Sequence, residues 1–223
     1  MTGFGLVNKA AIKGLIFDLD GVLIHSRAAH AKAFEEVFAG FGITGFDYGR
    51  FAGWRTDEVV AAVFAEHPHV TASLETIGEC ADRKSRRARE LLSAGDHIAE
   101  GCTATLERLS RRYSISLASS GSRASVEAFL SKTGLRSVFR CVLAGEDVKR
   151  AKPHPEIFRR SIRALGLPPE CCVVIEDAAA GVEAALCAGA CVVGIAGEHP
   201  ELLLRAGADC VVRSLSELEG LLT

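Results

Sequence analysis

The chain has 223 residues, of which 48% are hydrophobic, and a formal net charge of −2. This length and apolar content suit one large domain, or a core with a small accessory domain. The nearly balanced charge gives no general basic field for nucleic acid or a membrane surface, so any phosphate recognition must come from a few local cations.

The N-terminal residues lack a charged segment followed by a long apolar core, so we expect no secretory signal. No apolar run approaches the roughly 18 residues needed to cross a bilayer, so we expect no membrane partner. Cys171 and Cys172 are adjacent in an apolar run, and the chain has no Cys-x-x-Cys pair. The eight cysteines therefore indicate buried free thiols in a reducing cytoplasm rather than disulfides or a metal site.

Residues 11–17 form a short, mostly apolar run that predicts a strand buried on both faces. Asp18 and Asp20 follow at once, and Gly21 then turns the chain. Acidic side chains at the carboxyl end of a buried parallel strand lie where open α/β sheets bind ligands. The alternative is that both acids are ordinary turn or cap residues.

Residues 25–95 show helix and loop patterns without a convincing strand. Apolar residues at helical spacing predict helices over 26–40, 56–66 and 71–93, and the last of these carries a basic run at 83–89. We interpret 25–95 as a helical cap domain inserted after the first strand.

From residue 101 the predicted strands and helices alternate, which indicates βαβ units, a parallel sheet and right-handed crossovers. The predicted class is α/β, with a Rossmann-like parallel-sheet core (1–24 and 96–223) and the inserted all-helical cap. The expected strands are 113–118, 138–143, 171–175, 190–195 and 210–212, and the expected helices are 102–111, 122–133, 155–165, 179–188, 200–206 and 214–222.

Two polar motifs lie in the predicted core. Ser119, Ser120 and Gly121 end the strand at 113–118 with hydroxyls and free backbone amides, which cradle phosphate oxygens or simply form a turn. Lys152 is followed by Pro-His-Pro, and two prolines stiffen the approach to the next helix. This favours a lysine held in one pose over a solvated surface lysine.

Glu176 and Asp177 end another apolar strand and open a helix. Adjacent carboxylates repel each other unless a cation neutralises them, and hard oxygen ligands suit Mg²⁺. Asp177 also fits a helix N-cap.

The run Asp18-Leu-Asp20-Gly21-Val-Leu resembles the first signature of the haloacid dehalogenase-like (HAD) hydrolases, in the form found in their phosphatase and phosphomutase branches. The motifs at Ser119, Lys152 and Asp177 resemble the later signatures, in the same order. The resemblance covers the whole chain and points to the β-phosphoglucomutase-like and sugar-phosphate phosphatase branch with a helical cap.

This resemblance implies a catalytic mechanism. Asp18 would attack phosphorus and form an aspartyl-phosphate, Asp20 would act as general acid and then as general base, and Lys152 would offset negative charge. The implied ligands of Mg²⁺ are Asp18, the Asp20 carbonyl and Asp177, with Glu176 as an outer or alternative ligand. The implied phosphate-binding residues are Ser119, Ser120, Gly121 and Lys152.

For residues of the predicted cap, the sequence allows more than one role. His30 matches a cap histidine of the β-phosphoglucomutase branch, or packs on the apolar face of its helix. Arg55 would bind an anionic or polyol end of the substrate, or lie on the surface. Trp54 would pack within the cap, which we favour, or line the pocket. Lys84 resembles a cap cation that reaches the pocket, but its basic neighbours favour a solvated face. His25 stands where related sequences carry an acid, which affects substrate preference.

The sequence thus predicts a Mg²⁺-dependent phosphatase for a small phosphorylated metabolite such as a sugar or polyol phosphate. The alternatives are a β-phosphoglucomutase-like phosphomutase and, less favoured, a non-catalytic phosphate-binding protein. We expect a cytoplasmic monomer or weak homodimer without a nucleic-acid partner.

Overall fold

The computed structural model describes residues 9–196 and 199–222, so the N-terminal segment 1–8, for which we expect no secretory signal, lies outside the described residues. Six strands form one parallel sheet in the order β3-β2-β1-β4-β5-β6. The fold is α/β and Rossmann-like, as predicted. The strands are β1 (Gly14–Phe17), β2 (Ser114–Ala118), β3 (Phe139–Leu143), β4 (Cys172–Glu176), β5 (Cys191–Ile195) and β6 (Cys210–Val212).

Strand β1 lies inside the sheet, and all four of its residues are buried. It pairs with β2 on one side and β4 on the other, and Phe17 is in register with both Leu117 and Ile175. The carboxyl ends of these three strands therefore lie at one edge. The strand order reverses between β1 and β4, and such a switch point is where open α/β sheets bind ligands.

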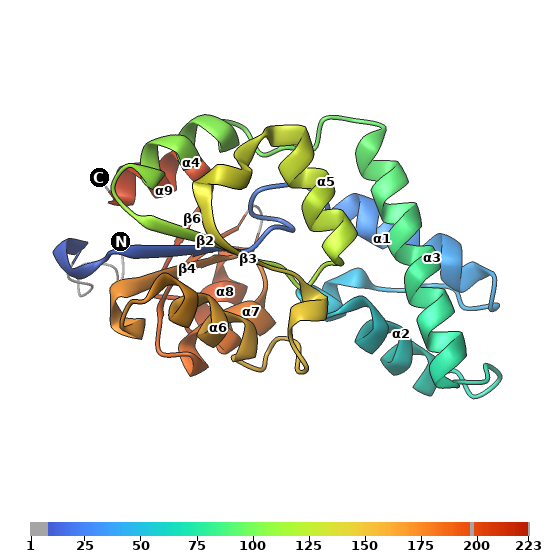
Figure 1. Cartoon of the computed structure of the whole chain (residues 1–223). Coiled ribbons are helices and arrows are strands. Elements are labelled where there is room, and N and C mark those ends of the chain that lie inside the picture. The colour runs from blue at the N-terminus through green and yellow to red at the C-terminus, as the bar shows by residue number, and fades with distance from the viewer. Residues whose placement is uncertain (1–8, 197–198, 223) are drawn as a thin grey trace.

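Helices cover both faces of the sheet (Figure 1). One face packs on α4, α5 and α9, and the other packs on α6, α7 and α8; each face has its own apolar core. Gly134 ends α5 in a left-handed cap, with φ at 70°. These helices are α4 (Cys102–Ser110), α5 (Arg123–Thr133), α6 (Glu156–Leu165), α7 (Ala179–Cys187), α8 (Pro200–Arg205) and α9 (Leu215–Leu222).

A separate helical segment, residues 25–95, contains α1 (Arg27–Ala39), α2 (Thr56–Ala65) and α3 (Leu74–Ser93). It lies beyond the sheet edge (Figure 1) and has a third apolar core of its own, rich in phenylalanine. Two stretches of chain join it to the sheet domain and pair with each other through a bridge between Ile24 and Ile98. The exact domain boundaries stay a prediction.

Some local expectations need correction. Residues 11–13 are not strand: a 3₁₀ turn, η2 (Lys9–Ala11), comes first and β1 begins at Gly14. Helix α3 begins at Leu74 rather than 71, because the Ser73 hydroxyl accepts the Thr76 N–H and caps the helix there. All eight cysteines are free, as predicted, but only Cys80, Cys102 and Cys172 are buried. Four others are half-buried, and Cys187, at the end of α7, is exposed. None of the described helices combines the length and apolarity needed to span a membrane.

Candidate active site

The centre of the site is a buried lysine held between two carboxylates. Lys152 Nζ lies 2.6 Å from Asp18 Oδ1 and 2.6 Å from Glu176 Oε1. Asp18 follows β1, Glu176 ends β4, and Lys152 comes from the loop before α6, so residues 134 positions apart meet at the sheet edge. Lys152 is only 2% exposed, so its charge acts on this site and not on solvent.

Glu176 is fixed on both sides. Its Oε1 accepts from Lys152, and its Oε2 accepts the backbone N–H groups of Asp177 and Ala178. Gly181 makes room for this carboxylate, because a Cβ at that position would lie 2.0 Å from Oε1. Glu176 therefore holds the lysine and the start of α7 in one arrangement.

Asp177 faces the loop after β1. Gly21 has a φ of 80°, and a Cβ there would lie 1.9 Å from Asp177 Oδ2, so only glycine leaves room for this carboxylate. Asp18, Glu176 and Asp177 each offer an oxygen, and these atoms all lie within 4.8 Å of one another. If all three carboxylates were ionised, one ammonium among them would leave an excess of two negative charges. This donor set fits a divalent cation with a preference for oxygen, such as Mg²⁺.

Electrostatics of the cluster agree with that fit. Burial raises the pKa of Asp18, Glu176 and Asp20 raise it further, and Lys152 opposes them. Burial also raises the pKa of Asp177, together with the neighbouring carboxylates. Burial alone would lower the pKa of Lys152, but Asp18 and Glu176 outweigh it and raise that pKa. Lys152 therefore stays protonated, but its single positive charge does not balance the carboxylates around it.

The loop after β2 closes another side of the site. Ser119 is fully buried, and its hydroxyl accepts the Gly121 N–H at 2.9 Å. Ser120 and Gly121 line the pocket, whereas the Ser119 side chain lies behind them. The Ser120 hydroxyl donates to the Gly53 carbonyl of the helical segment at 2.9 Å.

On the other wall, His30 contacts Asp20. His30 Nε2 lies 2.7 Å from Asp20 Oδ1, and Lys84 Nζ lies 3.0 Å from His30 Nδ1. Burial would raise the pKa of Asp20, but the interaction with His30, together with Ser26 and Lys84, outweighs burial and lowers that pKa. When Lys84 is charged it can only donate, so His30 accepts at Nδ1 and donates Nε2–H to Asp20. His30 thus contacts the site and is also packed on its helix.

The favoured expectation for Lys84, a solvated face, is wrong, and the alternative that it reaches the pocket is confirmed. It is 4% exposed, and its ammonium lies 4.1 Å from the centroid of the Phe34 ring. Burial lowers its pKa to about 8, and Asp20 partly opposes this. The basic neighbours of Lys84 suggested a solvated face, but position 84 lies on the inner side of α3, toward α1.

The geometry and the sequence point to the same family. The model of the haloacid dehalogenase-like hydrolases matches residues 12–189.

The chain belongs to the haloacid dehalogenase-like hydrolases.

Among its relatives, protein CbbY of Cereibacter sphaeroides is 32% identical over 222 residues, which cover 94% of this chain and 95% of that protein. Validoxylamine A 7'-phosphate phosphatase of Streptomyces hygroscopicus subsp. limoneus is 31% identical over 212 residues, covering 92% and 95%. The crystal structure of β-phosphoglucomutase from Clostridium difficile superposes with a TM-score of 0.81 at 28% identity, covering 93% of each chain. The named relatives of this hydrolase thus include a phosphatase and a phosphomutase.

Two residues that line the pocket of this hydrolase carry no sequence motif. Arg27 begins α1, and Tyr48 begins the 3₁₀ turn η3 (Tyr48–Phe51) in the loop between α1 and α2. The Tyr48 and His30 rings stack with centroids 6.1 Å apart. Burial and the nearby acids raise the pKa of Tyr48, so its hydroxyl stays protonated. Only the packing of the loop against α1 brings these side chains to the pocket.

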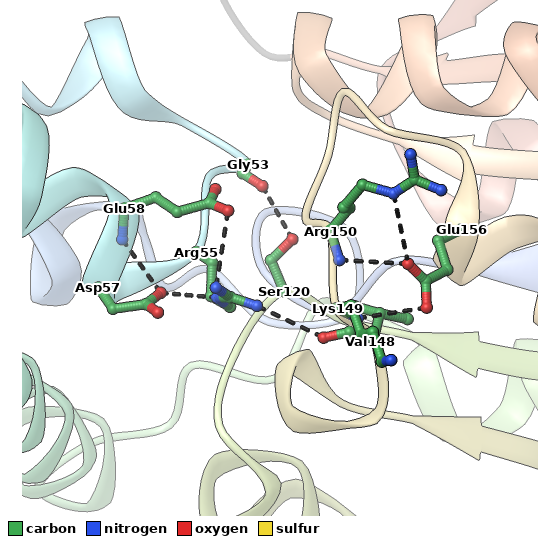
Figure 2. A network of polar contacts seen from close by, with 9 residues as sticks. All are labelled: Gly53, Arg55, Asp57, Glu58, Ser120, Val148, Lys149, Arg150 and Glu156. Atoms are coloured by element: carbon green, nitrogen blue, oxygen red, sulfur yellow. Dashed lines mark hydrogen bonds and ion pairs between the residues drawn. The ribbon is translucent and has the colours of Figure 1, made fainter.

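Arg55 does not line the pocket. Its Nε donates to Asp57 at 2.6 Å, a second nitrogen lies 3.7 Å from Glu58, and Nη1 donates to the Val148 carbonyl at 3.4 Å (Figure 2). It joins the helical segment to the sheet domain. Trp54, next to it, lines the pocket and also packs edge-on against Phe51, so both alternatives for this residue hold.

Proposed function

We propose that this hydrolase is a Mg²⁺-dependent phosphatase of a small phosphorylated metabolite, such as a sugar or polyol phosphate, with Asp18 as nucleophile. One observation carries the proposal: the Asp18 carboxylate follows β1 at the switch point of the sheet, 2.6 Å from a buried lysine and beside two further acids. A carboxylate can approach a phosphate dianion only where fixed positive charge offsets the repulsion.

In the first step, an Asp18 oxygen attacks phosphorus and the bond to the leaving alkoxide breaks, which gives an aspartyl-phosphate. Asp20 gives its proton to the alkoxide. In the second step, Asp20 takes a proton from water, which attacks phosphorus and releases inorganic phosphate.

The contacts of Asp20 support this dual role. His30 keeps Asp20 ionised in the substrate-free protein, and a phosphate dianion beside it would raise its pKa again by like-charge repulsion. His30 and Lys84 hold the carboxylate at one place on the wall opposite Asp18. We therefore assign His30 and Lys84 to positioning Asp20.

Asp18, the Asp20 carbonyl and Asp177 would hold Mg²⁺, with Glu176 as outer neighbour because both of its oxygens are already engaged. The ion would supply charge stabilisation for the phosphoryl oxygens. Lys152 and the backbone amides of Ser120 and Gly121 would bind the same oxygens, and the Ser119 hydroxyl would keep the Gly121 amide in place.

The helical segment 25–95 would act as the cap over this site. It contributes His30, Lys84, Tyr48 and Arg27 to the far wall of the pocket. Contacts from Gly53 and Arg55 to the sheet domain hold the segment against the site in this structure.

The test is release of inorganic phosphate from a panel of phosphorylated metabolites and from p-nitrophenyl phosphate, with Mg²⁺ and with EDTA. We expect release with Mg²⁺ alone. If every ester were hydrolysed equally well in EDTA, the proposed dependence on Mg²⁺ would be refuted. Failure to hydrolyse any ester would contradict the phosphatase and favour a non-catalytic phosphate-binding protein.

The second candidate is a phosphomutase, favoured by the close superposition on a β-phosphoglucomutase. Conversion of β-glucose 1-phosphate into its isomer without net phosphate release would support it. The same panel therefore separates the two reactions.

A further inference from the structure

The basic side chains in and behind the pocket differ in whether they already have a partner in the protein. Lys84 and His30 form a chain that ends on Asp20, and Lys152 lies behind the pocket between Asp18 and Glu176. These three bases are committed to the carboxylates that surround the reacting phosphoryl group.

Arg27 is different. It lines the pocket and is exposed, and its side chain makes no hydrogen bond or ion pair with any residue in 9–196 or 199–222. Its guanidinium carbon lies 5.9 Å from the centroid of the Tyr48 ring, and a Cβ on Gly49 would lie 3.3 Å from its Nη2. Asp47, the acid of the same loop, accepts the Gly49 N–H at 2.8 Å rather than pairing with Arg27. The guanidinium is thus placed by an aromatic face and a backbone, and its donors are left for a ligand.

Arg55 is the arginine that the sequence offered as a candidate for binding the substrate, but its side chain already has protein partners. Its donors go to Asp57, Glu58 and the Val148 carbonyl (Figure 2). A substrate anion would have to displace two carboxylates from Arg55, whereas it would displace only water from Arg27.

A neighbouring group indicates that this wall receives a ligand. The Ser26 hydroxyl is buried and lines the pocket, and it has no hydrogen-bond partner of ordinary geometry among the described residues, although it lies close enough to Asp20 to lower the pKa of that acid. A buried hydroxyl without a partner is costly and rare in folded proteins. Ser26 and Arg27 therefore offer adjacent polar groups on one wall of the pocket.

We propose that Arg27 is a specificity-determining residue that binds a second anionic group of the substrate, a carboxylate or a second phosphate, distal to the phosphoester that lies at Asp18. The inference rests on the proposed phosphatase function and adds the substrate class. A second anion in this pocket meets Asp20 and Asp177, so binding it requires a cation that those acids have not already engaged, and Arg27 meets this condition.

The experiment compares substrates that differ only in the distal group. One pair is 6-phosphogluconate and sorbitol 6-phosphate, which tests a carboxylate; the other is glucose 1,6-bisphosphate and glucose 1-phosphate of the same anomer, which tests a phosphate. For each pair the measured quantity is the ratio of kcat/KM for the doubly anionic ester to kcat/KM for its partner. The pair with the larger ratio identifies the anion.

We expect the wild type to prefer the doubly anionic ester, and Arg27→Met to lower this ratio about 10-fold or more, chiefly through KM. Arg27→Lys should restore part of it. Arg55→Met, the matched control, should change the ratio less than about 3-fold. The preference should also weaken as salt rises from about 0.05 to 0.5 M, because Arg27 is exposed to screening.

A ratio at or below unity in the wild type, or an equal ratio in Arg27→Met, would overturn the inference. The phosphatase function is judged separately by hydrolysis of p-nitrophenyl phosphate, which has no distal anion. If that reaction fails, calorimetric binding of the same ester pairs to Asp18→Asn and to Asp18→Asn/Arg27→Met still decides the role of Arg27: equal affinities in the two variants refute it, and a selective loss for the doubly anionic ester supports it.

Discussion

The two walls of the pocket are built by different means. On the sheet side, Asp18, Lys152 and Glu176 are placed by strand ends and by the loop before α6, and each is bonded to another member of the set. On the helical side, His30, Lys84 and Arg27 come from two helices whose positions depend on a separate apolar core. The side chains of the sheet wall hold one another in place. The side chains of the helical wall can differ in identity without changing that arrangement.

This difference has an electrostatic consequence. The sheet wall collects carboxylates that could hold a cation, and the helical wall brings positive charge from Lys84 and Arg27. The electrostatic field in the pocket is therefore set by the helical segment and the sheet domain together, where the two are in contact. Four substitutions test this difference between the two walls, and the one at Asp18 should have the largest effect.

Asp18→Asn should abolish the chemistry of the sheet wall. The amide cannot serve as the nucleophile, so turnover should fall by about 10⁴-fold or more. Thermal unfolding followed by circular dichroism should show a folded protein, because Glu176 still pairs with Lys152. Substantial retained phosphate release would refute the assignment of Asp18.

Lys152→Met should damage both stability and activity. It leaves two buried carboxylates without their cation, so in EDTA the free energy of unfolding should fall by about 3 to 5 kcal/mol. Urea titration measures this change. Lys149→Met is the matched control, because that lysine is exposed and its side chain makes no ion pair with a described residue. Equal unfolding midpoints for the two variants would contradict the structural role of Lys152.

Lys84 should make stability depend on pH. Its pKa falls from 10.5 to about 8 on folding, so between these values the unfolded chain binds more protons than the folded one, and the free energy of unfolding rises with pH. Relative to Lys84→Met, the wild type should gain about 3 kcal/mol between neutral pH and pH 10.5. The buried thiols titrate equally in both proteins and cancel in the difference. Parallel urea-unfolding curves at all pH values would show that Lys84 is not a buried cation.

Ser120→Ala should have the smallest effect. It removes the hydrogen bond from the sheet domain to the Gly53 carbonyl, which contributes about 1 kcal/mol. We expect a change of only about 2- to 5-fold in KM and little change in kcat, measured on the best ester of the panel. Ser110→Ala, which removes a local hydrogen bond within α4, is the control. A loss as large as that of Lys152→Met would mean that the Ser120 hydroxyl contacts the reacting group.

Much of the sheet wall was readable from the sequence. Each buried strand is a short apolar run, and the polar residues that carry the chemistry follow it directly, as Asp18 follows β1 and Asp177 follows β4. Parallel strands place their carboxyl ends at one edge, so local order along the chain already predicts which side chains meet. The engagement of both Glu176 oxygens was not predicted, because it depends on the exact path of α7 past Gly181.

On the helical wall, the resemblance of the sequence to its family singled out His30, but tertiary structure decided the contacts of that residue and the roles of its neighbours. Lys84 and His30 are 54 positions apart, and nothing local distinguishes Lys84 from its basic neighbours on α3. A helix presents residues on every side, so which residue turns inward is set by where its neighbours pack. For the same reason the sequence drew attention to Arg55, whereas the packing of the helical segment engages Arg55 elsewhere and leaves Arg27 facing the pocket.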